Sequence, residues 1–369
     1  NTGGQYTVGA GTASWELDCF GRIRSLKQAA LEQYFATEQA RAAAQISLVS
    51  AVAEVYLALA ADGENLRLAK ATLDAQQASL ELIQRSRDFG IASDLDVHEA
   101  QAQVDAARVD IARYSGLVTL DQNALDLVVG APVPADLKPD GLDGVPEFGD
   151  VAAGLPSDVL LRRPDIVASE HQLKAAYANI GAARAAYFPR ITLTAAAGLV
   201  STDLSDLFTA GAGTWSFAPQ LLYPIFDAGA RKAGYRVAEV DRDLAVAEYE
   251  KAIQTAFREV SDALGLRRTL AEQQDAQQSL VRSLEEAYRL ADARYKAGID
   301  GYLNVLVAQR ALYNAQEGLV SVRLARRANL VTFYKVLGGG WAATGPATPA
   351  PGGGTSDSGQ VPPDTDGRK

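Results

Sequence analysis

The sequence offers few groups that could do chemistry. His98 and His171 are the only histidines and Cys19 is the only cysteine, so no internal disulfide can form and no spacing of ligands predicts a metal site. Serine, histidine and aspartate occur without a nucleophile-elbow motif, and Gly338-Gly339-Gly340 lacks the Lys and Ser/Thr of a phosphate loop. The residues therefore predict no catalytic site, no metal and no cofactor.

The charge balance excludes a further class of partner. The net charge is −10 and basic residues do not gather into long runs, which argues against a nucleic-acid partner and against a polybasic membrane anchor. Because no unbroken stretch of about 18 apolar residues occurs, no transmembrane helix is expected. Membrane β-strands stay open as a prediction, since such strands are short and alternate in polarity.

Proline placement indicates where long helices can form. No proline precedes Pro132, and none lies between Pro224 and Pro346. Both spans are rich in Ala, Leu, Gln, Glu and Arg, which are good helix formers. Residues 22 to about 89 predict one helix of roughly 100 Å if it is continuous, and Asp62-Gly63 is where an interruption would fall.

The two proline-free spans are copies of one unit. The segment from Gly90 to Gln101 matches the segment from Gly298 to Gln309 at a constant offset (298 − 90 = 208). Val128-Val129-Gly130 matches Val336-Leu337-Gly338 at the same offset. Such a match over some 40 residues indicates a duplicated half rather than two unrelated domains.

Each copy predicts a helical hairpin whose turn contains Gly90 or Gly298. The return helices carry apolar residues at spacings of three and four, which is a heptad seam, broken by Asp121 in the first copy and by Arg326 and Asn329 in the second. On this pattern alone, a soluble coiled coil is an equal alternative. The seam residues are Val97, Ala100, Val104, Ala107, Ile111, Tyr114, Val118, Leu125 and Val128, then Val305, Ala308, Leu312, Ala315, Leu319, Val322, Phe333 and Val336.

Three segments alternate apolar and polar residues with the period of a β-strand: 13–18, 191–195 and, less cleanly, 215–223. Taken singly, each could belong to an ordinary hairpin on a soluble domain. Their position favours a membrane barrel, because the strand blocks lead directly into long helices and two or three strands cannot form a stable sheet alone. They would need partner chains.

A run in the middle of the chain resembles a known family. The segment from Gly154 to Ile166, which contains Arg162-Arg163-Pro164-Asp165, is similar to the signature of TolC-like outer-membrane factors of tripartite RND-type efflux pumps, in their lipoprotein branch. Trp15 to Arg22 also resembles this family, although Cys19 stands where Leu is expected. Tyr334 to Trp341 resembles the end of its folded part, so the resemblance runs from Tyr6 to Trp341.

The resemblance implies a mainly α fold with a small β part. Long antiparallel helical hairpins would form an α-barrel, and the strands would contribute to a trimeric transmembrane β-barrel, with the chain internally duplicated. The expected units are a first repeat at 1–130, a crossover at 131–190, a second repeat at 191–341 and a disordered Pro/Gly-rich tail at 342–369. A fourth strand and any lipid-bearing cysteine are expected upstream of Asn1.

The implied function is a passive exit duct for small molecules in the outer membrane of a Gram-negative bacterium, with a long periplasmic extension. The implied partners are two further copies in a homotrimer, a periplasmic adaptor (membrane fusion) protein at the hairpin tips, an inner-membrane transporter and outer-membrane lipid, with no nucleic acid. The alternatives are a soluble or adaptor-type periplasmic coiled-coil protein without a pore, and a type I protein-secretion duct.

The resemblance also places a periplasmic gate at the hairpin tips. Asp96 falls on the family's linking carboxylate and Tyr295 on its linking aromatic residue, whereas Asp300 stands where the family has a linking Arg. The family's acidic ring would fall on Asn304 and Val307, so a substitute ring of Asp94, Asp96 and Asp300 is predicted to attract cations. The open alternative is that these aspartates only cap a helix. Closure is then expected to rest on packing of Tyr295, Tyr302 and Leu303.

The signature residues Arg162, Arg163, Pro164 and Asp165 are predicted to be structural. They would fix the crossover between the two halves rather than line a pore. Pro164 forces the preceding residue into an extended conformation and suits the first turn of the helix that follows.

Overall fold

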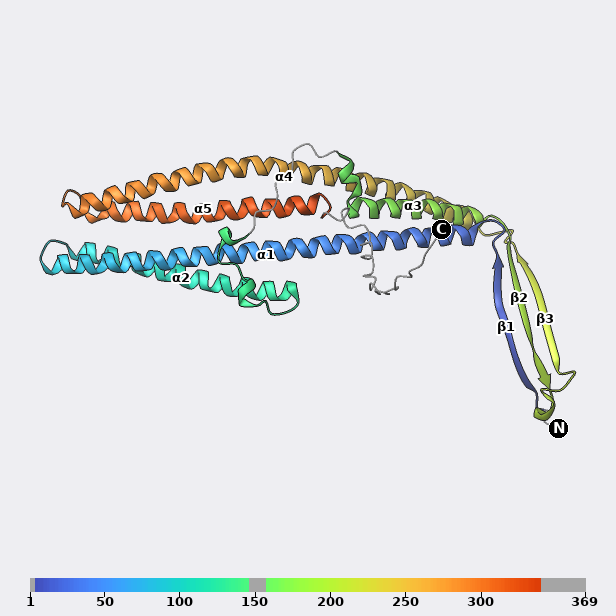
Figure 1. Cartoon of the computed structure of the whole chain (residues 1–369). Coiled ribbons are helices and arrows are strands. Elements are labelled where there is room, and N and C mark those ends of the chain that lie inside the picture. The colour runs from blue at the N-terminus through green and yellow to red at the C-terminus, as the bar shows by residue number, and fades with distance from the viewer. Residues whose placement is uncertain (1–3, 146–156, 340–369) are drawn as a thin grey trace, which may run out of the picture.

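The computed structural model describes residues 4–145 and 157–339. Two long helical hairpins lie side by side, with both turns at one end of the molecule and a three-stranded sheet extending from the other end (Figure 1). The first hairpin is α1 (Arg22–Asp88) with α2 (Asp94–Val129), and the second is α4 (Ala230–Lys296) with α5 (Tyr302–Val336). The predicted disordered tail lies outside the described residues.

The duplication is visible in the helix lengths. α1 and α4 contain 67 residues each, and both boundaries of α4 follow those of α1 at the sequence offset given above. Each hairpin turns at a glycine in the left-handed region, Gly90 with φ 70° and Gly298 with φ 69°. Glycine adopts this conformation without the penalty that a Cβ brings, so both turns fall at equivalent positions. The fold class is confirmed, whereas the domain boundaries drawn above stay a prediction.

α1 is continuous through Asp62-Gly63, so no interruption falls there. A glycine inside a helix costs about 1 kcal/mol relative to alanine. The residues before it offset that cost, because Leu57, Ala60 and Ala61 are buried in an apolar cluster with Val320 and Val331 of α5.

α1 also differs from the prediction of no membrane-length apolar helix. By length and composition alone it could cross a membrane, with an 18-residue window of mean hydropathy 1.6, of which 28% is buried. The prediction counted only unbroken apolar residues, and polar residues interrupt the apolar ones here. α1 packs along α2, α3 (Pro164–Ala185) and α5, so its apolar residues have helical neighbours.

The remaining helical elements connect the two halves. α3 lies against both α1 and α4, beside the end that carries the sheet (Figure 1). Within the described residues, four short 3₁₀ turns complete the chain; they are η1 (Ala135–Leu137), η2 (Leu142–Gly144), η3 (Ser157–Arg162) and η4 (Leu204–Asp206).

The three predicted strands are present and longer than predicted. β1 (Tyr6–Leu17), β2 (Arg190–Ser201) and β3 (Gly213–Leu222) form an antiparallel sheet in the order β1-β2-β3. Small residues such as Gly9, Gly11 and Gly198 fill the far halves of β1 and β2, and they show no apolar–polar alternation that a sequence pattern could detect. Among the described strands, none pairs with the outer edges of β1 and β3.

The register gives the sheet one apolar and one polar face. Trp15 lies opposite Leu193, and Phe217 lies opposite Ala195, so these side chains share a face. That apolar face carries Leu17, Trp15, Ile191, Leu193, Trp215, Phe217 and Leu221, and the other carries Glu16, Thr192, Thr194, Thr214, Ser216 and Gln220. Such alternation suits a sheet with hydrocarbon on one side and an aqueous lumen on the other.

Arg163 joins three elements at the crossover. Its guanidinium donates to Asp165 at the start of α3 (3.0 and 2.6 Å), to Glu259 of α4 (2.8 Å) and to the carbonyl oxygen of Val336 at the end of α5 (3.0 Å). The side chain is 8% exposed. Pro164 begins α3 and Arg163 is extended before it, as predicted.

We expect Arg163→Ala to destabilise the protein by about 3 kcal/mol, because it leaves two carboxylates and one carbonyl without their buried cation. The midpoint of thermal unfolding of the purified protein in detergent measures the effect. Arg162→Ala is the matched control, since this neighbouring arginine is exposed and its loss should cost at most about 0.5 kcal/mol. Equal midpoints for the two variants would contradict the crossover role.

Candidate functional site: hairpin tips and the seam between the hairpins

The tip of the first hairpin caps its own helix. The Ser93 hydroxyl accepts a hydrogen bond from the Asp96 backbone N–H (3.2 Å), and the Asp96 carboxylate accepts from both the Ser93 N–H and its hydroxyl (2.8 Å each). This reciprocal arrangement is a capping box at the start of α2. Asp96 therefore has the capping function that the sequence left as an alternative, while exposed Asp94 lies 3.6 Å from Arg87.

The tip of the second hairpin uses an ion pair. Arg294 donates to the Asp300 carboxylate at 2.6 and 3.1 Å, and this hydrogen bond holds the pKa of Asp300 below its usual range. The Asn304 side chain adds a weaker effect in the same direction. Asp300 is thus ion-paired within its own tip, and its carboxylate stays charged.

Two tyrosines connect the tips. The rings of Tyr295 and Tyr302 lie 5.4 Å apart. Tyr302 is buried with Ile83 of α1, and burial raises its pKa to about 12. Burial raises the pKa of Tyr295, and the nearby carboxylate of Asp96 adds to the shift. The structure therefore brings Asp96 and Tyr295 together across the hairpins.

Leu303 does not take part in this packing. Its side chain is 56% exposed, because it follows Tyr302 on the helix and points away from α1. The contribution of Leu303 to closure of the gate stays a prediction.

Farther from the tips, polar contacts join α2 to α5. The Tyr114 hydroxyl donates to Glu317 at 2.6 Å, Arg113 donates to the same carboxylate at 3.3 Å, and Tyr313 donates to Asp110 at 3.2 Å. Burial and the Glu317 carboxylate raise the pKa of Tyr114 to about 12. The sequence analysis did not predict these pairs, and the only signal was Tyr114 in an otherwise aliphatic seam.

A second polar group joins α1 to α5. Arg323 donates to Glu64 of α1 at 2.5 Å and also to Asp143, which follows the α1–α2 hairpin in the chain. Leu142 beside it is fully buried, so this segment is fixed against both hairpins.

Asp121, the polar break in the first heptad seam, faces a second carboxyl group. Its side chain interacts with that of Asp62 on α1, and its Oδ2 atom is buried without a hydrogen-bond partner among the described residues. Burial and the neighbouring Asp62 raise the pKa of Asp121 to about 6. Two carboxyl groups in contact must share a proton or repel each other.

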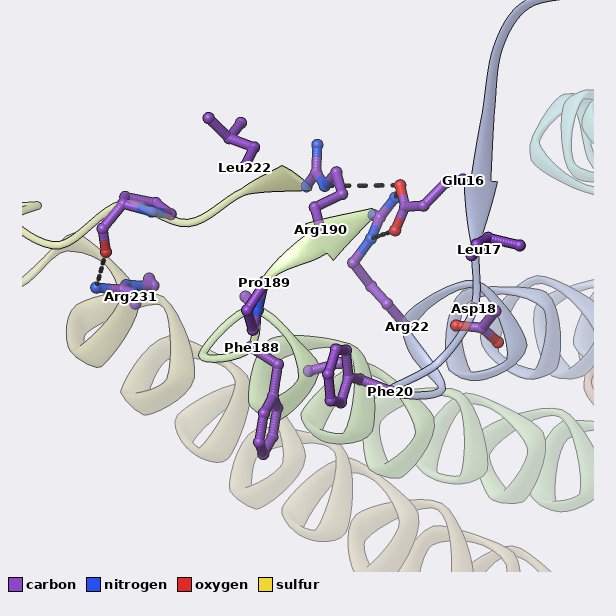
Figure 2. Close-up of a pocket in the computed structure, with 13 residues that line it drawn as sticks. Glu16, Leu17, Asp18, Phe20, Arg22, Phe188, Pro189, Arg190, Leu222 and Arg231 are labelled. Atoms are coloured by element: carbon purple, nitrogen blue, oxygen red, sulfur yellow. Dashed lines mark hydrogen bonds and ion pairs between the residues drawn. The ribbon is translucent and has the colours of Figure 1, made fainter. Parts of the chain in front are cut away.

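The strands meet the helices at a charged junction. Figure 2 shows Glu16 of β1 facing both Arg22 and Arg190, with Phe20 and Phe188 close together below them. Arg22 donates to Glu16 at 2.8 and 2.5 Å, Arg190 lies 3.6 Å from it, and the two rings stack at 4.6 Å. The cavity here measures about 230 Å³. The contacts of Glu16 with Arg22 and Arg190 join β1 and β2 to the start of α1.

The described residues contain no group of three or more His, Cys, Asp or Glu side chains that could hold a metal ion. What the geometry offers is a long helical body, a two-faced sheet and polar links between hairpins.

Comparison with known proteins identifies this architecture. The family described as outer membrane efflux protein matches residues 1–131 and 155–339. The chain belongs to this family. Its members named below are channel proteins rather than enzymes.

Two relatives are pump components of Pseudomonas putida, and each is 50% identical over 338 residues, or 91% of this chain and 70% of the relative. They are the toluene efflux pump outer membrane protein TtgC and the antibiotic efflux pump outer membrane protein ArpC. The open state of the Neisseria gonorrhoeae MtrE outer membrane channel matches with a TM-score of 0.83 and 41% identity, over 91% of this chain and 76% of that one.

The chain is therefore an outer-membrane channel component of a tripartite efflux system, with a periplasmic extension. The apolar sheet face and the charged junction fit this location. The apolar face ends at the junction, and the charged start of the helix follows there. The adaptor-type and soluble coiled-coil alternatives do not account for the match. The gate roles of Asp94, Asp96, Tyr295, Asp300 and Asn304 stay predictions.

The Asp62–Asp121 pair predicts a pH-dependent stability. A carboxyl group whose pKa is raised in the folded state stabilises that state fully at pH values below its unfolded pKa of 3.8. This contribution to the free energy of unfolding is lost as the pH rises to about 6. We expect the thermal midpoint of the wild type to fall over this range, and Asp121→Asn to flatten the fall and to raise the midpoint at about pH 7.

Midpoints measured in detergent at intervals of pH test this, with Asp74→Asn as the control. Asp74 is an exposed aspartate on the same helix as Asp62, so its variant should keep the wild-type profile. A variant of Asp121 that also keeps that profile would show that the pair does not share a proton.

Proposed function

We propose that three copies of the chain close into one duct, which carries small molecules such as solvents and antibiotics through the outer membrane. The observation that carries this proposal is the sheet. It has an apolar face and, among the described strands, two unpaired edges, and unpaired backbone groups are too costly to leave in hydrocarbon. Neighbouring copies would supply the missing strand partners.

The proposed cargo follows the relatives. TtgC is named for toluene and ArpC for antibiotics, and both share half of the residues of this chain over most of its length. This similarity favours small-molecule export over protein secretion.

The trimer is testable directly. We expect the complete protein to sediment as a trimer in mild detergent, because only sheet closure satisfies the strand edges. Analytical ultracentrifugation measures the mass of the assembly. A stable monomer under these conditions would sink the proposed duct.

The hairpin tips are proposed as the periplasmic gate and as the surface where a periplasmic adaptor docks, with an inner-membrane transporter behind it. Apolar side chains stand exposed at both turns: Phe89 at 81% and Ile91 at 83% in the first, and Ile299 at 62% in the second. Exposed apolar groups of this size at a polar helix end mark an interaction surface.

The gate is held by packing of Tyr295 and Tyr302 against the first hairpin. The acidic residues Asp94, Asp96 and Asp300 line the mouth and attract cations. Asp96 and Asp300 also hold the local structure of each tip, so a test must remove charge while keeping their hydrogen bonds.

The double variant Asp96→Asn with Asp300→Asn removes both charges. An amide oxygen can accept both hydrogen bonds from Ser93 at position 96 and one of the two from Arg294 at position 300. We expect the cation-over-anion selectivity of the complete channel in planar bilayers to fall by roughly twofold, with little change in resting conductance. Asp105→Asn, an exposed aspartate of α2, is the control. Unchanged selectivity would show that the two aspartates act only as caps. A large rise in resting conductance would show that they hold the gate closed.

A further inference from the structure

The two hairpins of one chain meet along α1 and α5, which run antiparallel. This contact is here called the seam, and it is distinct from the heptad seam of the return helices. Two apolar clusters close it. Near the middle, Leu57, Ala60 and Ala61 pack against Val320 and Val331. Near the tips, Ile83 packs against Tyr302, Val305 and Leu306.

A pair of glutamines lies between these clusters. Gln76 stands seven residues before Ile83 on α1, and Gln309 stands seven residues after Tyr302 on α5. Because seven residues are two helical turns and the helices are antiparallel, these steps place both glutamines on the seam, opposite one another. Their burial agrees, since Gln76 is 4% exposed and Gln309 is 7% exposed.

The amide oxygens of both glutamines are buried without any hydrogen-bond partner among the described residues. Buried acceptors of this kind cost free energy unless a donor reaches them, and water is the donor that can do so. A third polar atom on this face, the hydroxyl of Tyr302, is also buried without a hydrogen-bond partner among the described residues.

Amides within a hairpin behave differently. Gln277 of α4 donates to the carbonyl oxygen of Ala315 on α5 at 2.8 Å, and Asn329 donates to the carbonyl oxygen of Ala263 at 3.3 Å. Gln101, which the duplication matches to Gln309, turns its amide to Asp105 on the surface. Gln277 and Asn329 inside the second hairpin are therefore paired through their amides, whereas the amide oxygens of Gln76 and Gln309 are not.

We propose that Gln76 and Gln309 form a water-admitting break in the seam, which weakens the closed contact beside the tips so that the hairpins part there first. Parting the helices hydrates both amides and removes the cost of their burial, so the break favours opening. The link to opening rests on the proposed gate at the tips, whereas the break itself rests on the two buried amides.

The double variant Gln76→Met with Gln309→Met tests the break, because methionine keeps the length of the side chain and removes the unpaired acceptor. In the complete protein in detergent, we expect amide hydrogen exchange in the segments around residues 76 and 309 to slow by roughly tenfold and the thermal midpoint to rise. In planar bilayers, the resting conductance should fall.

Gln277→Met is the matched control with the opposite sign. It removes a satisfied amide from the interior of a hairpin, so its thermal midpoint should fall. A double variant that lowers the midpoint as the control does, or that leaves exchange around residues 76 and 309 unchanged, would overturn the proposed break. Slower exchange with unchanged conductance would confirm the dry seam but contradict its link to opening, and would count against the gate at the tips.

Discussion

The backbone groups at the two outer edges of the sheet constrain the arrangement of the rest of the molecule. In hydrocarbon, each backbone N–H or C=O without a partner costs several kcal/mol, so a three-stranded sheet with an apolar face needs other strands around it. The chain meets this need with two-faced strands of 10 to 12 residues, of which β1 leads into α1 and β3 into α4. Glu16, Arg22 and Arg190 join the two parts, which ties the direction of each helix to the edge of the sheet. A closed barrel of strands therefore imposes a closed arrangement of helices beneath it.

Duplication makes such closure geometrically simple. α1 and α4 have equal lengths and turn at equivalent glycines, so both hairpins reach the same level below the membrane. Unequal hairpins would leave the two turns at different heights, at the end proposed above as the docking surface. Arg163 fixes the crossover to the second half at the other end of α5, through Glu259 and Val336.

The sequence predicts those features that repeat or that depend on one residue's backbone preference. Absence of proline predicted the long helices, the glycines predicted the turns, and Pro164 predicted the start of α3. The heptad seam predicted the burial of Ala100, Val104 and Phe333.

What the sequence could not predict are contacts between elements far apart in the chain. Glu64 with Arg323 and Glu317 with Tyr114 depend on how two hairpins align, and no local pattern carries that alignment. The function of Asp96 was also undetermined, because a carboxylate at the third helical position serves a cap and a pore mouth equally well.

The two tips share one backbone conformation but differ in the side chains that stabilise them. At equivalent positions the first hairpin has Ser93, Asp94 and Asp96, and the second has Gly301, Tyr302 and Asn304. The first set satisfies its own helix start and needs nothing from outside. The second hairpin has no side-chain cap, because its N-cap residue is Gly301. It packs Tyr302 against α1 instead. One tip is therefore self-sufficient while the other depends on its neighbour. The gate proposed at the tips depends on this difference, because a contact that opens must be made by groups that the local fold does not require.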